Sequence, residues 1–236
     1  MRILAFETSA KAASVALLTD GALTAESFQN SGLTHSRTIM KLAQDLLETC
    51  ELSPADLDFV AWANGPGSFT GIRIGAAAAK GLCWGLELPA LPVSTLEAMA
   101  WNAVDLEGVI CCCMDARRSQ VYNALFRARD GALTRLREDR AISLDELAAD
   151  LVTLDGPIHL VGDGALLSWE NLRDRVSGLH LISEHMRQQR AAGVGLAGWR
   201  AVLLGKAENA ALSVPNYLRL SQAERERLAK ETHKGE

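Results

Sequence analysis

The sequence predicts an α/β protein built from two similar domains, each with a mixed β-sheet flanked by helices. A pattern of apolar segments, an acidic residue and an Asp-Gly turn occurs twice, at residues 3–24 and 109–134. Helix-capping signals follow each repeat, and strands followed by helices are typical of mixed α/β domains. We expect the domains to span residues 1–106 and 107–219, with a charged tail at 220–236.

Each repeat reads as a strand ending in an acid, a short loop, a second strand, a hairpin turn and a return strand. The turn is Asp20-Gly21 in the first repeat and Asp130-Gly131 in the second, and Ala-Leu-Thr follows both turns. This shared context indicates a duplicated unit. The predicted strands lie at residues 3–7, 14–18 and 22–24 in the first repeat and at 109–115, 121–126 and 132–134 in the second.

Helices are predicted after the strands of each repeat. Thr34 is placed to cap a helix that runs to about Cys50, whereas Ser94 and Ser143 each open a capping-box pattern with Glu three residues later. The first of these helices is amphipathic. Its apolar face consists of Ile39, Ala43, Leu46, Leu47 and Cys50.

The most informative segment is the glycine-rich stretch at residues 64–81. The apolar run at 59–62 predicts a buried strand, and Gly65-Pro66-Gly67 predicts a turn. Thr70 is placed to cap a helix that follows at once and runs to about Trp84. The segment therefore predicts a strand, a tight turn and a helix in direct succession.

Small residues recur at every fourth position of this helix and form a smooth strip along one face. The strip consists of Gly71, Gly75 and Ala79. Because a glycine inside a helix costs about 1 kcal/mol, we expect the strip to allow the close approach of another backbone. Anion binding at the start of the helix is the alternative, but Thr70-Gly71-Ile72 stands where a phosphate-binding loop has Gly-Lys-Ser/Thr.

Composition limits the classes of function. The chain has 236 residues, a net charge of -5 and a pI near 5.6, which argues against binding nucleic acid by its own electrostatic field. Hydrophobic residues make up 48% without a long uncharged run, so we expect a globular protein with no membrane span. Glu7 comes too early for a signal peptide. The cysteines at 111–113 read as reduced core residues of a cytoplasmic protein.

The chain changes character beyond Pro215. Residues 221–227 and those after them are charged and lack a good apolar stripe. We therefore expect the tail at 220–236 to fray or to stay disordered.

The duplicated plan resembles the actin-like ATPase superfamily, and within it the chain is most similar to the bacterial TsaB family, also called YeaZ. This resemblance implies a role in tRNA threonylcarbamoyladenosine synthesis and a duplicated actin-like (ribonuclease H-like) fold. The glycine-rich segment is its most specific part, and the matches extend over nearly the whole chain. The matching segments are residues 4–9, 34–37, 65–75, 114–118 and 215–219.

The loops that hold a nucleotide in the actin-like kinases are altered in this sequence. Those kinases present amides to the phosphates and carboxylates to the metal from a pair of Asp-x-Gly hairpins. The corresponding residues 7–12 and 115–118 contain no glycine. Side chains there obstruct the approach of phosphate oxygens. Residues 161–165 resemble a remnant of the nucleotide-binding glycine motif, which a strand-to-helix turn explains equally well.

The sequence offers no set of residues for catalysis or metal binding. The related catalytic subunit TsaD carries a His-x-x-x-His metal site, whereas no two histidines of this chain stand four apart. Ser68 lies outside a Gly-x-Ser-x-Gly elbow. We expect no catalytic residue, no cofactor and no metal. The alternative is an independent actin-like small-molecule kinase or peptidase.

The resemblance to TsaB implies a non-catalytic subunit that binds and supports a TsaD-like catalytic subunit, with a TsaE-like ATPase as third partner. Their assembly would transfer a threonylcarbamoyl group to the adenosine beside the anticodon of tRNAs that read codons starting with A. The chain would meet tRNA only through this complex, and no membrane is involved.

The partner would be bound through the two helices that begin near Thr34 and Thr70. Two questions stay open. The lone chain could form a homodimer through the same surface, and Arg117-Arg118, or Arg135, Arg137 and Arg140, could form a basic patch for tRNA. The predicted partner-binding residues are His35, Arg37, Ile39, Ala43, Leu46, Gly71, Ile72, Gly75 and Ala79.

Overall fold

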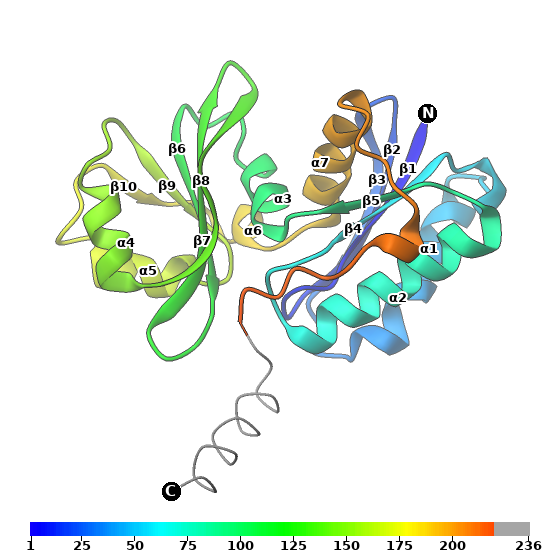
Figure 1. Cartoon of the computed structure of the whole chain (residues 1–236), viewed down its shortest axis with the longest axis horizontal. Coiled ribbons are helices and arrows are strands. Elements are labelled where there is room, and N and C mark those ends of the chain that lie inside the picture. Colours follow the sequence, from blue (N-terminus) through cyan, green and yellow to red (C-terminus); the bar gives the residue numbers. More distant parts are fainter. Residues whose placement is uncertain (220–236) are drawn as a thin grey trace, which may run out of the picture.

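The computed structural model describes residues 1–219, which form two five-stranded sheets with helices against their faces (Figure 1). The strand order is β3-β2-β1-β4-β5 in the first sheet and β10-β9-β6-β7-β8 in the second. The first sheet consists of β1 (Arg2–Glu7), β2 (Ala13–Thr19), β3 (Ala22–Gln29), β4 (Phe59–Ala63) and β5 (Ala90–Val93). The second consists of β6 (Gly108–Asp115), β7 (Gln120–Arg129), β8 (Ala132–Ser143), β9 (Ile158–Val161) and β10 (Leu179–Leu181).

The two sheets have the same topology. In each, three consecutive strands form an antiparallel meander, and the first of them also pairs in parallel with the fourth strand. A fifth strand then extends the sheet in parallel. Each half therefore contains one mixed sheet, and the duplication predicted from the repeated sequence is confirmed.

Of the four helices whose starts were predicted, α1, α3 and α4 begin where the sequence indicated. Ser94 and Ser143 cap α3 and α4, because their hydroxyl oxygens accept hydrogen bonds from the backbone N–H groups of Glu97 and Glu146, each at 3.2 Å. The prediction for α2 was wrong by two residues. Ser68 caps this helix, and its Oγ accepts a hydrogen bond from Gly71 N at 3.3 Å. The helices are α1 (His35–Thr49), α2 (Phe69–Leu86), α3 (Thr95–Trp101), α4 (Leu144–Leu151), α5 (Ala165–Leu172), α6 (Glu184–Arg187) and α7 (Ala191–Leu203), and the short 3-10 helix before the last described segment is η2 (Ala210–Leu212).

Both faces of each sheet are covered. Because side chains along a strand alternate between the two faces, neighbouring residues of one strand belong to different cores. In β1, Leu4 contributes to the core under α1 and α2, whereas Ile3 contributes to the core on the opposite face. In β6, Cys111 and Cys113 pack on the side of α4 and α5, and Cys112 packs on the side of α3. All three cysteines are buried and free. The sequence correctly placed successive cysteines on opposite faces.

Helix α7 packs against the first sheet, although it follows the second sheet in the chain (Figure 1). Its glycines permit close contacts, since a Cβ on Gly193 would overlap the carbonyl oxygen of Ala98 in α3. A Cβ on Gly195 would likewise overlap the side chain of Leu18. The division at residues 106 and 107 stays a prediction, but α7 lies with the first half rather than with the second half to which we assigned it.

The predicted tail at 220–236 lies outside the described residues. Among the helices within residues 1–219, no helix combines the length and the apolar character that a membrane crossing requires.

The fold brings three parts of the chain together around the first sheet: the N-terminal strands, the α1–α2 pair and the returning α7.

Candidate functional site

The glycines of the turn before α2 allow two other segments to approach it closely. Gly65 has a φ of +111°, and a Cβ there would overlap the carbonyl oxygen of Asn216. A Cβ on Gly67 would lie 2.6 Å from the carbonyl oxygen of Ser9. Ser68 N donates a hydrogen bond of 2.7 Å to that same oxygen of Ser9. The turn is therefore held between the end of β1 and the last described segment of the chain.

The small-residue strip of α2 is also used within the chain. A Cβ on Gly71 would overlap the carbonyl oxygen of Thr8, and a Cβ on Gly75 would overlap Thr8 Oγ1. Thr8 Oγ1 donates a hydrogen bond of 2.8 Å to the carbonyl oxygen of Gly71. Close approach was correctly expected. The backbone that approaches, however, is that of Thr8, directly after β1 of the same chain.

Most of the predicted partner-binding residues therefore need correction. The apolar face of α1 and the strip of α2 are both needed to cover one face of the first sheet, which leaves none of that area for another protein. The residues buried in this way are Ile39, Ala43, Leu46, Gly71, Ile72, Gly75 and Ala79. Of the predicted set, Arg37 is exposed, and His35 is half-buried with its Nε2 2.8 Å from the carbonyl oxygen of Ala10.

A second line of small residues lies on the opposite, exposed side of α2. It consists of Ala77, Gly81 and Gly85, and a Cβ on either glycine would meet open space. Next to it, Trp84 is 88% exposed. On the neighbouring helix α1, Met40 is 45% exposed.

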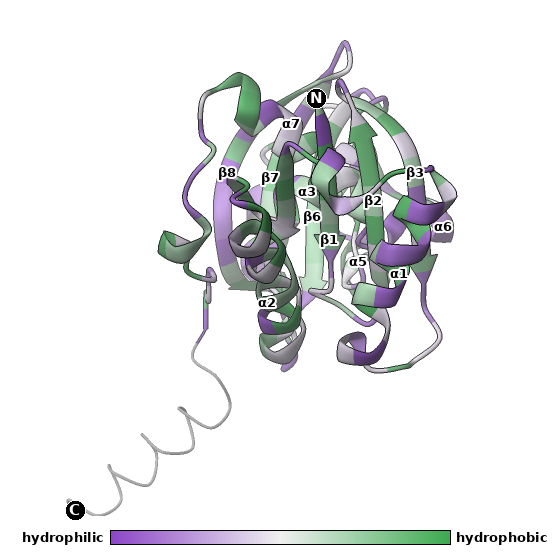
Figure 2. Cartoon of the chain, turned by 90° about the vertical axis from the view of Figure 1, so that its right-hand side faces the viewer, coloured by the Kyte–Doolittle hydropathy of each residue, from purple (hydrophilic) through white to green (hydrophobic). Residues whose placement is uncertain are grey.

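Helices α1 and α2 lie side by side on one side of the molecule (Figure 2). We call their exposed side the outer face, defined by Arg37, Met40, Ala77, Gly81 and Trp84. A signal for it is present in the sequence, because Ala77, Gly81 and Gly85 repeat the spacing of four seen in Gly71, Gly75 and Ala79.

A pocket of about 510 Å³ lies between the two halves, where the ends of β1 and β6 meet the turn before α2. Its walls carry hydroxyl, basic and acidic groups, among them Ser9, Lys11, Asp115, Asp163 and Arg219. The loops that follow β1 and β6 lack glycine. In the second loop, Arg117, Arg118 and Ser119 all have φ values between 55° and 63°, in the left-handed region that favours glycine.

A buried carboxyl group lies next to this pocket. Glu7 is 1% exposed, its Oε1 accepts a hydrogen bond of 2.5 Å from Ser9 N, and its Oε2 has no hydrogen-bond partner among residues 1–219. Burial raises the pKa of Glu7 to about 7, with the negative charge of Asp163 acting in the same direction. Within residues 1–219, no three His, Cys, Asp or Glu side chains are grouped to hold one metal ion.

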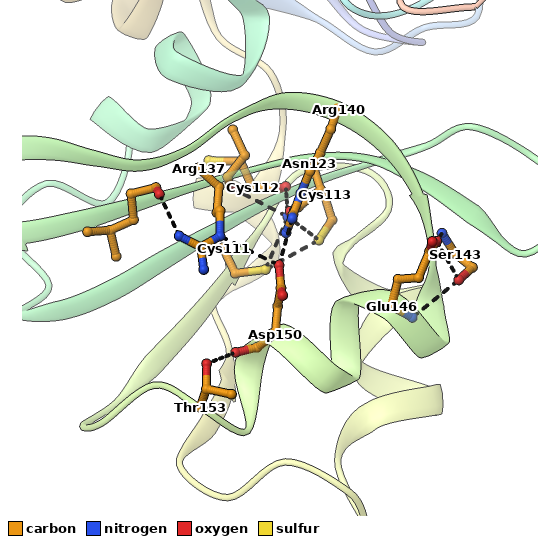
Figure 3. Close-up of polar contacts among 12 residues, drawn as sticks. Cys111, Cys112, Cys113, Asn123, Arg137, Arg140, Ser143, Glu146, Asp150 and Thr153 are labelled. Atoms are coloured by element: carbon orange, nitrogen blue, oxygen red, sulfur yellow. Dashed lines mark hydrogen bonds and ion pairs between the residues drawn. The ribbon is translucent and has the colours of Figure 1, made fainter.

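Two of the arginines considered as a basic patch, Arg135 and Arg140, are occupied by contacts within the chain. Arg135 forms ion pairs with Glu97 at 2.9 Å and Asp139 at 2.7 Å. Arg140 forms an ion pair of 2.6 Å with Asp150 and donates two hydrogen bonds to Asn123 Oδ1, at 3.1 and 2.9 Å (Figure 3). The guanidinium groups of Arg135 and Arg140 thus join β7 and β8 to α3 and α4, which makes these two arginines poor candidates for a phosphate-binding surface.

Comparisons with known proteins identify close relatives of the chain. The family model for TsaD, tRNA N6-adenosine threonylcarbamoyltransferase, matches residues 29–159. The tRNA threonylcarbamoyladenosine biosynthesis protein TsaB of Bacillus subtilis is 35% identical over 227 residues, which cover 95% of this chain and 96% of that protein. TsaB of Escherichia coli is 38% identical over 184 residues, which cover 77% of this chain and 78% of the relative.

Solved structures agree with this relationship. YeaZ from Pseudomonas aeruginosa superimposes with a TM-score of 0.76 at 25% identity, covering 92% of this chain and 99% of that chain. Component A of (R)-2-hydroxyglutaryl-CoA dehydratase from Acidaminococcus fermentans has a TM-score of 0.53 at 12% identity, and it covers 86% of this chain and 99% of that chain. The second likeness concerns the fold alone. Together with the two matching sheets, these structures show the duplicated actin-like α/β fold.

Proposed function

The chain belongs to the TsaB family, whose members are tRNA threonylcarbamoyladenosine biosynthesis proteins, and from this membership we propose that it is a non-catalytic subunit. In this proposal it binds and supports a TsaD-like catalytic subunit in the cytoplasm. A TsaE-like ATPase completes the assembly, and tRNA is met only through it. The complex transfers a threonylcarbamoyl group to the adenosine beside the anticodon of tRNAs that read codons starting with A.

The observation that carries the binding role is the outer face of α1 and α2. An exposed Trp84 lies beside glycines whose Cα atoms face open space, so a partner helix can approach the backbone of α2 closely. A tryptophan in such a position loses a large apolar area from water when a partner covers it. The buried residues among those predicted to bind the partner act indirectly, because they fix α1 and α2 against the first sheet.

Two observations favour a subunit without its own catalysis. The loops at the pocket carry side chains where phosphate-binding hairpins have glycine, and one of them adopts left-handed backbone at Arg117, Arg118 and Ser119. The buried Glu7 has no cationic partner among the described side chains that contact it, and its pKa is raised. Metal binding requires the ionised form, and burial disfavours that form of Glu7.

A substitution on the outer face tests the proposal. Gly81→Arg places a long charged side chain in the middle of this face, where its Cβ meets open space. We expect the affinity for the TsaD-like protein of the same genome to fall by at least about tenfold, or about 1.4 kcal/mol. Val152→Arg, at an exposed position beyond α4, serves as the matched control and should bind normally. Wild-type affinity of the Gly81→Arg variant would refute the proposed surface.

The absence of catalysis is tested separately. The purified chain is supplied with tRNA and threonylcarbamoyl-adenylate, and modified adenosine is measured by mass spectrometry of the digested tRNA. We expect modification only after the TsaD-like partner is added. Modification by the lone chain, or turnover of ATP by it, would instead support the independent enzyme.

A further inference from the structure

The last described segment connects the outer helix α2 with the pocket between the two halves. We call residues 213–219 the strap. It leaves η2 and runs beside α2, where Lys80 Nζ donates a hydrogen bond of 2.6 Å to the carbonyl oxygen of Ser213. It then joins the glycine-rich turn. Asn64 Nδ2 donates to the carbonyl oxygen of Val214 at 2.8 Å, and Asn216 N donates to the carbonyl oxygen of Asn64 at 2.7 Å.

The middle of the strap is held by an aromatic and cationic contact with the first turns of α2. The ring of Tyr217 lies 4.5 Å from the ring of Phe69, measured between centroids. The guanidinium carbon of Arg73 lies 3.8 Å from the centroid of Phe69, and Arg73 Nε donates a hydrogen bond of 3.1 Å to the hydroxyl oxygen of Tyr217. Arg73 is an exposed residue of α2, so the contact between Arg73 and Tyr217 of the strap lies at the molecular surface.

The far end of the strap contacts the second half. Arg219 Nη1 donates a hydrogen bond of 2.7 Å to the carbonyl oxygen of Ala116. That carbonyl directly precedes the left-handed run of Arg117, Arg118 and Ser119, a backbone conformation that such residues keep only when surrounding contacts impose it. Asn216, Leu218 and Arg219 also form one wall of the pocket.

From these contacts we propose that the strap couples the exposed surface of α2 to the conformation of the 116–119 loop, and thereby to the shape of the pocket. With the strap in place, Arg219 holds the loop in its left-handed form. When Tyr217 is displaced from Phe69 and Arg73, Arg219 is withdrawn and the loop relaxes. A ligand at either end would change the stability of the other end by the same free energy, because such coupling is reciprocal.

Hydrogen–deuterium exchange of the full chain measures the first link. Arg219→Ala removes the donor to Ala116, so we expect the peptide that covers residues 115–121 to exchange about tenfold faster or more. A peptide from α4 should be unchanged. Arg173→Ala is the matched control, because within residues 1–219 the guanidinium of Arg173 forms a single ion pair, with its neighbour Asp174 at 3.9 Å. Exchange at 115–121 that is the same in Arg219→Ala as in the wild type would overturn the proposal.

The second link is tested at a distance from the loop. Tyr217→Ala removes the ring and the hydroxyl group, and Tyr217→Phe removes only the hydroxyl group that accepts from Arg73. Tyr217→Ala should accelerate exchange at 115–121 nearly as much as Arg219→Ala, with Tyr217→Phe between it and the wild type. If Tyr217→Ala leaves this exchange unchanged, the strap makes two independent contacts and transmits nothing.

A last measurement rests on the proposed function. The TsaD-like partner should change exchange at 115–121 in the wild type, and this response should be lost in Arg219→Ala. If the partner binds without any such response, the coupling is refuted while the proposed function stands. If it fails to bind at all, the proposed function is refuted, and the strap is judged by the variants alone.

Discussion

At the scale of single residues, Glu7 is the group whose environment differs most from that of an ordinary carboxyl. It ends β1 next to the pocket, it is almost fully buried, and one of its oxygens has no partner. Burial penalises the charged form, and the pKa is raised from 4.5 to about 7. Protonated Glu7 is therefore favoured in the folded chain under conditions in which the unfolded chain carries an ionised carboxylate.

The sign of the pH effect follows from linkage. Because the folded pKa lies above the unfolded value, the contribution of Glu7 is most favourable below about pH 4.5 and is lost as the pH rises through about 7. Glu7→Gln removes this loss. We expect the variant to be more stable than the wild type by up to about 3 kcal/mol at pH 8, with little difference at pH 4.5.

Urea unfolding at a series of pH values measures the difference in free energy between variant and wild type. Glu170→Gln, at an exposed position on α5, is the control and should show a flat difference. If the difference in unfolding free energy between Glu7→Gln and wild type does not grow between pH 4.5 and pH 8, burial does not penalise the ionised form of Glu7 in solution.

At the scale of elements, α2 shows how two opposite faces of one helix can carry the same small-residue pattern for different reasons. On the inner face, Gly71 is needed because the carbonyl oxygen of Thr8 occupies the place of a side chain. On the outer face, Gly81 has open space around it. The same substitution should therefore have opposite effects at these two positions.

Alanine at each glycine of α2 measures this contrast. Gly71→Ala forces the end of β1 away from the helix, and we expect a loss of at least about 1–3 kcal/mol of unfolding free energy. Gly81→Ala removes a helix-breaking residue and should add about 0.5–1 kcal/mol. The urea midpoints, taken at equal m-values, provide the comparison. Equal destabilisation at both sites would show that the outer face is packed in solution.

Local patterns predicted most elements of this chain. Alternating apolar residues and Asp-Gly turns gave the two meanders, and the Ser-x-x-Glu signals gave the starts of α3 and α4. It was harder to predict which face of a helix packs within the chain and which face is exposed. A strip such as Gly71, Gly75 and Ala79 indicates close approach, but only the packed structure reveals that Thr8 of the same chain is the neighbour. The outer face was therefore missed as a set of residues.

At the scale of the whole molecule, α3 and a half-buried ion cluster hold the two halves together. Leu96 and Met99 of α3 pack on the second sheet, whereas Ala98 packs on the first. Arg135 of β8 forms ion pairs with Glu97 of α3 and with Asp139, and its guanidinium carbon lies 4.6 Å from the centroid of the Phe126 ring. Sequence spacing gives no sign of this contact between distant segments.

Removal of this guanidinium should weaken the joined molecule. Arg135→Ala leaves Asp139, whose side chain is 10% exposed, without its cation, and we expect a loss of about 1–3 kcal/mol. In a chain of this size each kcal/mol lowers the Tm by roughly 2–4 °C. Arg129→Ala, which removes an exposed ion pair with Asp130, should leave the Tm almost unchanged. Calorimetry of both variants decides the matter, and equal Tm values would show that the cluster adds no stability.

The return of α7 to the first sheet sets an order for folding during synthesis. The second sheet is built from one continuous stretch, β6 to β10, so the nascent chain can complete it without residues made later. The packing of the first sheet cannot be completed when its own strands leave the ribosome. Ile3, Ala5 and Leu18 are buried against α7, which is synthesised later. Domains generally fold in the order of translation. Here the half that is synthesised first should be the last to reach its native packing. The face of the first sheet that α7 covers stays exposed to solvent until Leu203 has left the ribosome.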